Sequence, residues 1–349
     1  MSQRSGWEEW REFRVLRKTF EDVSQSICSL FLEPVDGLPV DSFEPGQYLT
    51  FQFDVLDPVT QEARNIIRCY SFSDRPGLDH YRVSIKRIGL ASNHVHDAIR
   101  EGARLLAKGP GGQFCLDSGD LPVVLIAGGI GITPMLSMLN TLAEKGFPRE
   151  VWLFYGVRNS GEQVCKAYLE ELAKSQPNFH LHILYSQPLP HDQLGKDFRK
   201  AGHVDFALVR HTVLTHSMQF YVCGPRAMME AMVPALRNWG VPEAQIHFES
   251  FGPSSLGKSS SLEGSGGTIS FSKSEKSVLW DEKAESLLEF AEANGIDAPS
   301  GCRSGMCGAC QTEILAGEVD YFDEPDYDPD PGCCLLCISK PKGDLVLNV

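Results

Sequence analysis

The stretch Val123-Val-Leu-Ile-Ala-Gly-Gly-Ile-Gly-Ile-Thr-Pro-Met135 combines an apolar strand, a glycine turn and the start of a helix. Its five leading apolar residues are typical of a strand buried on both faces, and Pro134 suits the first position of a helix. Glycines here would let a pyrophosphate approach the helix N-terminus, where unpaired N–H groups favour an anion. Because the full G-x-G-x-x-G fingerprint is absent, an ordinary tight turn explains these residues alone equally well.

Strands and helices alternate after this motif. The sequence predicts further strands over residues 151–155, 180–185 and 219–222, and helices over 134–145, 162–174 and from 226 onward. Apolar strands between helices indicate a parallel sheet covered on both faces. A second glycine turn, Cys223-Gly-Pro225, follows a later strand. We expect the two turns to face each other across the carboxyl edge of the sheet.

The residues before this region have a different pattern. Short alternating runs, such as Tyr48-Leu-Thr-Phe-Gln-Phe53 and Tyr81-Arg-Val-Ser-Ile-Lys86, are separated by proline and glycine turns, which predicts an antiparallel barrel. Within it, Arg68-Cys-Tyr-Ser71 offers a cation for a phosphate, an aromatic ring, and a hydroxyl for a ring nitrogen. Read singly, each of these residues is more often an ordinary surface residue of a strand.

Residues 252–267 mark the clearest boundary. They hold five glycines and six serines in 16 positions, the composition of a flexible linker. We therefore predict four parts: a barrel over 11–117, an α/β domain over 118–251, the linker over 252–267, and a C-terminal domain over 268–349.

Six of the eleven cysteines lie between positions 302 and 337. Cys302-x4-Cys307-x2-Cys310 is the spacing with which one tight loop delivers three thiolates to a plant-type [2Fe–2S] cluster. Small residues within the loop let the backbone wrap closely and direct amide N–H groups at sulfur. A structural zinc site is the alternative, although zinc sites usually repeat pairs of closely spaced cysteines.

Three cysteines compete to be the fourth ligand. Cys337 lies in the apolar run Leu335-Leu-Cys-Ile338, which we expect to be a strand that holds a ligand rigidly. Cys333 and Cys334 directly follow the turn Pro331-Gly332 and are not expected to bind. The predicted ligand set is therefore Cys302, Cys307, Cys310 and Cys337.

Net charge limits the kinds of partner. The chain carries 32 basic and 46 acidic residues, a net charge of −14, which argues against binding to nucleic acid or an anionic membrane. The longest apolar stretch, residues 121–132, contains three glycines and is too short to span a bilayer. With no apolar run near the N-terminus, we expect a cytoplasmic protein without membrane insertion. A reducing compartment favours metal binding or catalysis over disulfides for its cysteines.

Acidic residues are concentrated near the C-terminus. Residues 268–349 hold 16 acidic and 6 basic residues, a net of −10, which leaves −4 for the other 267 positions. Seven carboxylates and no Lys or Arg occur within residues 318–330. This segment is either a solvated loop or a docking face for a basic partner.

Several motifs together resemble a known family. Arg68-x-Tyr-Ser71, Gly128-Gly-x-Gly-x-Thr-Pro134, Cys223-Gly-Pro225 and Phe248-Glu-Ser-Phe251 are similar to those of the ferredoxin–NADP⁺ reductase superfamily, and the cysteine loop resembles a plant-type ferredoxin. Over residues 11–349 the order resembles oxygenase-type reductases, and the flavin half also resembles the reductase part of flavohaemoglobins. The resemblance implies an antiparallel β-barrel flavin domain, an α/β parallel-sheet nicotinamide domain and a β-grasp ferredoxin-like domain.

The resemblance also implies roles on the flavin side. Arg68 would pair with flavin phosphate, Tyr70 would pack on the isoalloxazine, and Ser71 would approach its N5 atom. Gly89-Leu-Ala-Ser92 matches a phosphate segment found with FAD rather than FMN, which makes Ser92 the expected pyrophosphate ligand. The remaining residues expected around the flavin are Tyr48, which is otherwise a barrel-core aromatic, and Cys69, Lys86, Ala91 and Phe251.

Two histidines lie beside this phosphate segment. His94 and His96 are two positions apart, which points them in different directions on a helix. We therefore expect solvent-facing side chains and no metal site.

On the nicotinamide side, the resemblance implies that Thr133 and Cys223 flank the reacting ring, with Ser71 as the third catalytic residue. The pyrophosphate cradle would comprise Gly128, Gly129, Gly131, Pro134, Gly224 and Pro225. Members that prefer NADPH place an Arg after the Ser of a later strand end, where this chain has Ser186-Gln187-Pro188. NADH is therefore expected, and NADPH stays possible through Arg158.

The expected activity is electron transfer from NADH through FAD to the [2Fe–2S] cluster, and from there to a redox protein. A flavin links a two-electron donor to a one-electron acceptor. By family analogy the acceptor is an oxygenase component. The alternatives are a stand-alone nitric oxide, ferric or quinone reductase, and an electron carrier or sensor without reductase turnover.

Overall fold

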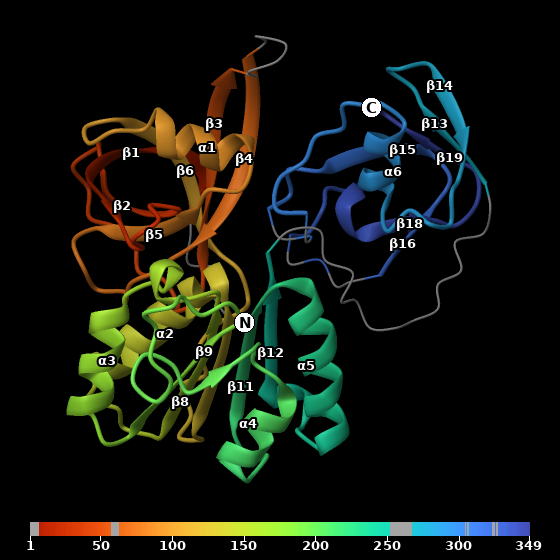
Figure 1. The fold of residues 1–349 in the computed structure, drawn as a ribbon. Helices are drawn as coiled ribbons and strands as arrows, with labels where there is room; N and C mark the ends of the chain where they lie inside the picture. The colour runs from red at the N-terminus through yellow and green to blue at the C-terminus, as the bar shows by residue number, and fades with distance from the viewer. Residues whose placement is uncertain are drawn as a thin grey trace. The chain divides into compact units, whose positions relative to one another are not determined.

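The computed structural model describes residues 7–56, 63–251, 267–303, 305, 307–322, 325 and 327–349 (Figure 1). The chain divides into two compact units, each described here by itself. The first comprises Met1–Arg64 and Tyr70–Phe251, and the second comprises Asn65–Cys69 and Gly252–Val349. The predicted linker, apart from Gly267, lies outside the described residues.

The N-terminal strands form one six-stranded sheet in the order β4-β3-β6-β1-β2-β5. Its elements are β1 (Trp7–Phe20), β2 (Ile27–Pro34), β3 (Tyr48–Leu56), β4 (Ala63–Ser71), β5 (Tyr81–Lys86), α1 (Leu90–Asp97) and β6 (Arg104–Gly111). The pairs β1–β2, β1–β6, β2–β5 and β3–β6 are all antiparallel. Phe43 stacks on Phe72 at 3.8 Å between ring centroids, and Tyr81 packs beside both rings. The expected antiparallel barrel domain is confirmed as a half-barrel sheet.

A six-stranded sheet in the order β10-β9-β8-β7-β11-β12 follows, with parallel neighbours throughout. Its strands are β7 (Val123–Gly128), β8 (Val151–Val157), β9 (Phe179–Tyr185), β10 (Lys200–Ala201), β11 (Gln219–Gly224) and β12 (Ile246–Ser250). Val123 and Leu125 belong to the core beneath the helix after β7, while Val124 and Ile126, which alternate with them, are also fully buried. The sheet is therefore covered on both faces, as expected.

Four α-helices and three short 3-10 turns connect these strands in the described chain. They are η1 (Gly129–Gly131), α2 (Ile132–Glu144), η2 (Ser160–Glu162), α3 (Lys166–Ser175), α4 (Phe206–Val213), α5 (Arg226–Trp239) and η3 (Glu243–Gln245). The helix predicted over 162–174 begins later, at Lys166. Cys165 before it has a left-handed φ of 53°, which interrupts any helix running on from η2.

The C-terminal chain forms a mixed sheet in the order β14-β13-β19-β15-β17, beside the pair β16-β18. Its elements are β13 (Thr268–Phe271), β14 (Lys276–Leu279), α6 (Leu287–Ala293), β15 (Gln311–Ala316), β16 (Val319–Tyr321), β17 (Cys333–Leu335), η4 (Leu336–Ile338), β18 (Ser339–Pro341) and β19 (Leu345–Leu347). β13 and β19 are parallel, and the other pairs are antiparallel. Trp280 packs on Phe290 of α6 in the core of this sheet. This is the expected ferredoxin-like domain.

The helices of the described ranges run from Leu90–Asp97 in α1 to Leu287–Ala293 in α6. None of the helices there is long and apolar enough to cross a bilayer.

Candidate functional site

The two glycine turns meet at the carboxyl ends of neighbouring parallel strands. Ala127 of β7 pairs with Cys223 of β11, and each turn begins at the next residue. A Cβ placed on Gly128 would lie 2.6 Å from Cδ of Pro225, and one placed on Gly131 would lie 2.3 Å from the carbonyl oxygen of Cys223. The expected face-to-face arrangement is confirmed, and side chains at these positions would force the turns apart.

Gly129 differs from its neighbours in the same turn. It has a left-handed φ of +54°, and a Cβ placed there would have nothing within 4 Å. The open side of the turn thus lies just before α2, where a pyrophosphate would meet the N–H groups of the first helical turn. The residues present therefore fit a dinucleotide phosphate. Pro134 is buried in the first turn of α2.

Thr133 lies in the first turn of α2. Its side chain is buried, with 2% exposed, and its hydroxyl donates to the carbonyl oxygen of Ile130 at 3.1 Å. The structure therefore shows Thr133 bridging η1 and α2.

Ser71 and Cys223 come together around a residue that sequence reasoning did not select. The Ser71 hydroxyl donates to Oε2 of Glu249 at 3.5 Å, and Glu249 lies beside Cys223 in the β11–β12 register. Ser71, Cys223 and Glu249 are all buried. Burial, reinforced by the Glu249 carboxylate, raises the pKa of the Cys223 thiol well above its usual range, so this thiol stays protonated.

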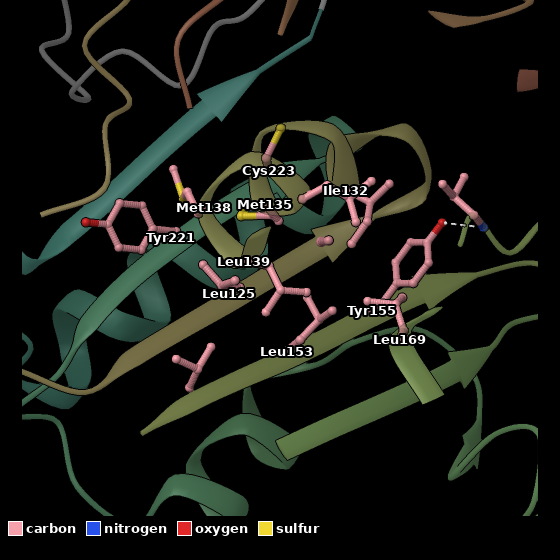
Figure 2. Close-up of a cluster of buried hydrophobic side chains, with 14 of the residues drawn as sticks. Leu125, Ile132, Met135, Met138, Leu139, Leu153, Tyr155, Leu169, Tyr221 and Cys223 are labelled. Carbon is pink, nitrogen blue, oxygen red and sulfur yellow. Dashed lines mark hydrogen bonds between the residues drawn. The ribbon is translucent and has the colours of Figure 1, made fainter. Parts of the chain in front are cut away.

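One feature of the sequence could have identified Glu249: it is the only charged residue of the motif Phe248-Glu-Ser-Phe251. The resemblance assigned this motif to the family but gave no role to its carboxylate. Figure 2 shows Cys223 beside Ile132 and Met135 at the edge of the buried cluster of this domain. Phe251, just past β12, is 41% exposed. A buried acid, a thiol and a hydroxyl thus lie together at the carboxyl edge.

The expected flavin residues of β3 and β4 have mixed environments. Tyr48 is only 4% exposed, and a Cβ on Gly112 would lie 2.7 Å from its ring, so it occupies the position of a barrel-core aromatic. Tyr70 is half-buried near the ring of Phe51, at 5.9 Å between centroids. Arg68 and Cys69 are half-buried on β4, and the Arg68 guanidinium donates to the carbonyl oxygen of Ile67 at 2.7 Å.

The segment expected to bind the second flavin phosphate forms the start of α1. The N–H groups of Ile88 and Gly89 both donate to the Ser92 hydroxyl at 2.9 Å. Ser92 and Ala91 are buried. Ser92 therefore ties the entry turn to the helix and holds the first turn of α1 in place, an arrangement that fits an anion at this helix end.

The expectation that both neighbouring histidines face solvent is wrong for His96. Its side chain is 5% exposed, and Nε2 lies 3.0 Å from the carbonyl oxygen of Ile85. Burial lowers the pKa of His96. The reason is that α1 packs back on β5 through this residue, while His94 is half-buried. No metal site involves either histidine among the residues that the structure describes.

Arg158 directly follows β8 and is paired with an acid. Its guanidinium donates to Oε1 of Glu162 at 3.2 Å, and the other carboxylate oxygen of Glu162 lies 3.5 Å from Nζ of Lys86. The Arg158 side chain is 64% exposed, whereas that of Glu162 is 18% exposed. Backbone N–H of Gln187 donates to the carbonyl oxygen of Arg158 at 2.8 Å, which joins the chain ends after β8 and β9.

The four predicted cluster cysteines lie together as two pairs. The N–H of Cys302 donates to Sγ of Cys307 at 3.2 Å, and the N–H of Cys307 donates to Sγ of Cys302 at 3.3 Å. Sγ of Cys310 lies 3.2 Å from Sγ of Cys337, which also accepts from the N–H of Gly305 at 3.3 Å. The hydrogen bond with Cys302 raises the pKa of the Cys307 thiol.

This pairing fits a binuclear cluster, in which each iron takes two thiolates. Within the described part of the chain, no three acidic, histidine or cysteine side chains converge as ligands of a single ion. A Cβ on Gly301 would lie 2.5 Å from Sγ of Cys307, so the loop closes around its sulfur atoms only because glycine is present. N–H groups directed at sulfur are the further feature that such a cluster requires.

The local structure around Cys337 corrects one prediction. Leu336–Ile338 is a 3-10 turn and not a strand, while Cys333 and Cys334 lie on β17. β17 pairs with β15 only from Cys333 to Leu335, so the chain turns immediately afterwards and directs Cys337 at Cys310. Burial raises the pKa of Cys334 to about 12, and Cys333 is half-buried near Asp330.

Comparisons with protein families match two parts of the chain. Residues 125–233 match the oxidoreductase NAD-binding domain, and residues 271–342 match the 2Fe-2S iron-sulfur cluster binding domain. Flavohemoproteins of Rhizobium meliloti and Halalkalibacterium halodurans are 41% and 37% identical over 256 and 257 residues, which is 71% of this chain in each case. The chain spans only 62% and 61% of the length of these relatives.

Two solved structures show the same architecture. Phthalate dioxygenase reductase, described as a modular structure for electron transfer from pyridine nucleotides to [2Fe–2S], is 28% identical with a TM-score of 0.61 over 98% of both chains. The FAD/NAD-binding domain of a Vibrio cholerae nitric oxide dioxygenase is 29% identical with a TM-score of 0.61, covering 70% of this chain and 99% of that one. The chain is therefore an oxidoreductase with an NAD-binding domain and a C-terminal [2Fe–2S] domain, and it resembles ferredoxin–NADP⁺ reductase-like FAD- and NAD(P)H-binding reductases such as phthalate dioxygenase reductase.

Proposed function

We propose that this protein transfers electrons from NADH through FAD to its [2Fe–2S] cluster, and from there to a separate iron-containing oxygenase. The observation that carries the proposal is the meeting of Ser71, Glu249 and Cys223 at the carboxyl edge of the parallel sheet. Support also comes from the paired cysteines and from the likeness to phthalate dioxygenase reductase over 98% of the chain. Bound FAD would supply the conversion between a two-electron hydride and a one-electron cluster.

The residues of this edge would position the two rings and exclude water. Glu249 accepts the hydrogen of the Ser71 hydroxyl, which fixes the position of that hydroxyl at the end of β4. Cys223 is fully buried and protonated, so it offers a small uncharged surface for the nicotinamide. We propose Ser71 and Cys223 as catalytic residues, with Glu249 added to them. Thr133, whose hydroxyl bridges η1 and α2, is proposed as the third residue that flanks the nicotinamide ring.

FAD is proposed over FMN because α1 supplies a second phosphate segment. Ser92 fixes the entry turn of α1 through the N–H groups of Ile88 and Gly89. FMN has a single phosphate, for which Arg68 on β4 suffices.

Domain limits of 11–117, 118–251 and 268–349, with a linker over 252–267, are also part of the proposal.

NADH is proposed over NADPH because Arg158 already has an acidic partner. Glu162 lies 3.2 Å from the Arg158 guanidinium and is also held by Lys86. A 2′-phosphate beside Arg158 would meet the Glu162 carboxylate, and like charges in close contact are unfavourable. Glu162→Gln should therefore raise kcat/KM for NADPH about tenfold relative to that for NADH, which corresponds to about 1.4 kcal/mol.

The matched control for this change is Glu170→Gln. Glu170 also forms an ion pair within the same domain, with Lys166 at 3.9 Å. Glu170→Gln should leave the ratio of kcat/KM for NADPH to kcat/KM for NADH unchanged. An unchanged ratio in Glu162→Gln would show that Glu162 does not select the cofactor.

The overall proposal is tested by anaerobic titration of the purified protein with NADH. We expect one FAD and one [2Fe–2S] cluster per chain, with flavin bleaching followed by cluster bleaching. Zinc without acid-labile sulfide would contradict the cluster. A flavin that does not bleach would favour a carrier or sensor, and faster turnover with nitric oxide, ferric iron or quinone than with an oxygenase component would favour a stand-alone reductase.

A further inference from the structure

The segment over residues 327–330 lies against the cysteine loop at several points. The N–H of Tyr327 donates to the carbonyl oxygen of Gly305 at 3.1 Å. A Cβ placed on Gly308 would lie 2.6 Å from Cε2 and Cζ of Tyr327, so the ring rests directly on this glycine. Asp330 and Gln311 exchange two hydrogen bonds, of 2.8 and 3.0 Å. We name residues 327–330 the cover segment.

These contacts fall on the peptide units that hold the cysteines. Gly305 donates its N–H to Sγ of Cys337 and accepts the N–H of Tyr327 at its carbonyl, so one residue joins the sulfur and the cover segment. Gly308 follows Cys307, and its carbonyl oxygen accepts from the N–H of Gln311 at 2.9 Å. The cover segment therefore contacts the loop on both sides of Cys307.

Glycine at position 308 has two separate consequences. Its φ of +69° is in the left-handed region, which lets the loop turn around the sulfur atoms. Its missing side chain also leaves that part of the loop bare, and the Tyr327 ring occupies the space. Tyr327 is half-buried and packs against the core of the C-terminal domain, so the ring is held from behind as well.

We propose that Tyr327 is a positioning residue that covers the cysteine loop and shields the cluster from water and small reactants. The proposal rests on the proposed function, since it requires a cluster at Cys302, Cys307, Cys310 and Cys337. An apolar shell around a metal site controls solvent access. Gly308 contributes no side chain to such a shell, and the Tyr327 ring lies at that position.

The test is the rate at which the cluster is lost from the purified full-length protein. Wild-type protein and Tyr327→Ala are mixed with EDTA in air, and the decay of the visible absorbance of the cluster is followed. We expect Tyr327→Ala to lose its cluster about tenfold faster. Tyr327→Phe should decay at nearly the wild-type rate, because the ring and not the hydroxyl lies over Gly308.

A control variant separates shielding from general loss of stability. Leu315 is a half-exposed side chain on β15 in the mixed sheet of the C-terminal domain. Leu315→Ala removes comparable apolar bulk at a position away from the cysteine loop. It should leave the decay rate unchanged. Equal acceleration in Leu315→Ala and Tyr327→Ala would overturn the proposal, as would equal rates in Tyr327→Ala and the wild type.

A double-mutant cycle with Gly308 adds a readout specific to the ring. Gly308→Ala should speed cluster loss in the wild-type background, because the new Cβ displaces the Tyr327 ring. The same change should have a smaller effect in the Tyr327→Ala background, where no ring remains to displace. Additive effects would overturn the proposal.

Two outcomes are distinguished before any rate is compared. Wild-type protein without acid-labile sulfide would mean that the proposed function has failed. Should Tyr327→Ala retain no cluster, Tyr327→Leu takes its place, because it keeps apolar bulk while losing the aromatic ring, and Tyr327→Phe accounts for the lost hydroxyl. A wild-type rate of cluster loss in Tyr327→Leu would then show that the ring gives no protection.

Discussion

The glycine turn after β7 and the cysteine loop of the C-terminal domain need glycine for different physical reasons. At the carboxyl edge of the parallel sheet, Gly128 and Gly131 have ordinary φ values of −119° and −61°, and a second turn excludes their side chains. In the cysteine loop, Gly305 and Gly308 have φ values of +75° and +69°, which other residues rarely adopt. The first turn thus depends on a neighbour from elsewhere in the chain, and the second on its own backbone conformation.

The comparison changes how a glycine motif is interpreted. In the turn over residues 128–131, a Cβ would be free of contacts only at Gly129, which is where a ligand has room. Its two neighbours are explained by protein packing alone. Glycines in a phosphate-binding sequence therefore do not all serve the phosphate.

The largest expected effect concerns the cysteine loop. Cys337→Ser should abolish the cluster, because Cys337 completes the pair with Cys310. Cys333→Ser and Cys334→Ser should leave the visible spectrum nearly intact, because both residues lie on β17 outside the two pairs. Iron and acid-labile sulfide analysis measures the outcome. Loss of the cluster in Cys333→Ser alone would show that the assigned fourth ligand is wrong.

The next largest effect distinguishes Gly129 from Gly131 in the turn that follows β7. Gly131→Ala should lower the free energy of unfolding by about 3 kcal/mol, because the new methyl group meets backbone that cannot move aside. Gly129→Ala should cost only about 1 kcal/mol, from its left-handed φ, while raising KM for NADH. Urea unfolding and steady-state kinetics measure both. Equal destabilisation by the two changes would contradict the packing explanation.

Acid should affect the two halves of the chain differently, because residues 268–349 contain no histidine. Burial, followed by the charge of Arg199, lowers the pKa of His182 to about 4. The unfolded chain binds this proton near pH 6.5, so stability is complete above that pH and is lost as the pH falls toward 4. The loss should reach about 2 kcal/mol at pH 5.

His182→Gln should remove this part of the pH dependence. The exposed His211, changed to Gln, serves as the control and should leave the pH dependence as it is. Denaturant unfolding at pH 7 and pH 5 gives both values. An unchanged difference between the two pH values in His182→Gln would show that another group controls acid stability.

The smallest expected effect concerns the charge difference between the two regions. Neutralising Asp323, Glu324, Asp326 and Asp328 should slow association with the acceptor several-fold and weaken its salt dependence, because screened long-range attraction is what salt removes. Asp323, Glu324 and Asp326 lie outside the described residues. NADH-dependent flavin reduction, followed by stopped-flow absorbance, should not change. Equal loss in both steps would mean that these carboxylates do not form a docking face.

Local sequence determined much of this protein. Alternating and continuous apolar runs predicted the antiparallel and parallel sheets, and the spacing of three cysteines predicted the cluster loop. These features are readable because periodicity and spacing reflect backbone geometry over a few residues. The two facing glycine turns also followed, because the carboxyl ends of neighbouring parallel strands lie at the same edge of a sheet.

Only the tertiary structure decided which side chains meet. Glu249 reaches Ser71 across 178 positions, and Tyr327 covers Gly308 from a segment that the sequence marked only as acidic. His96 is buried because α1 packs back on β5, and Cys337 reaches Cys310 from a 3-10 turn because the β15–β17 pairing ends at Leu335. Such contacts depend on how distant elements pack, and no local pattern of residues encodes that packing.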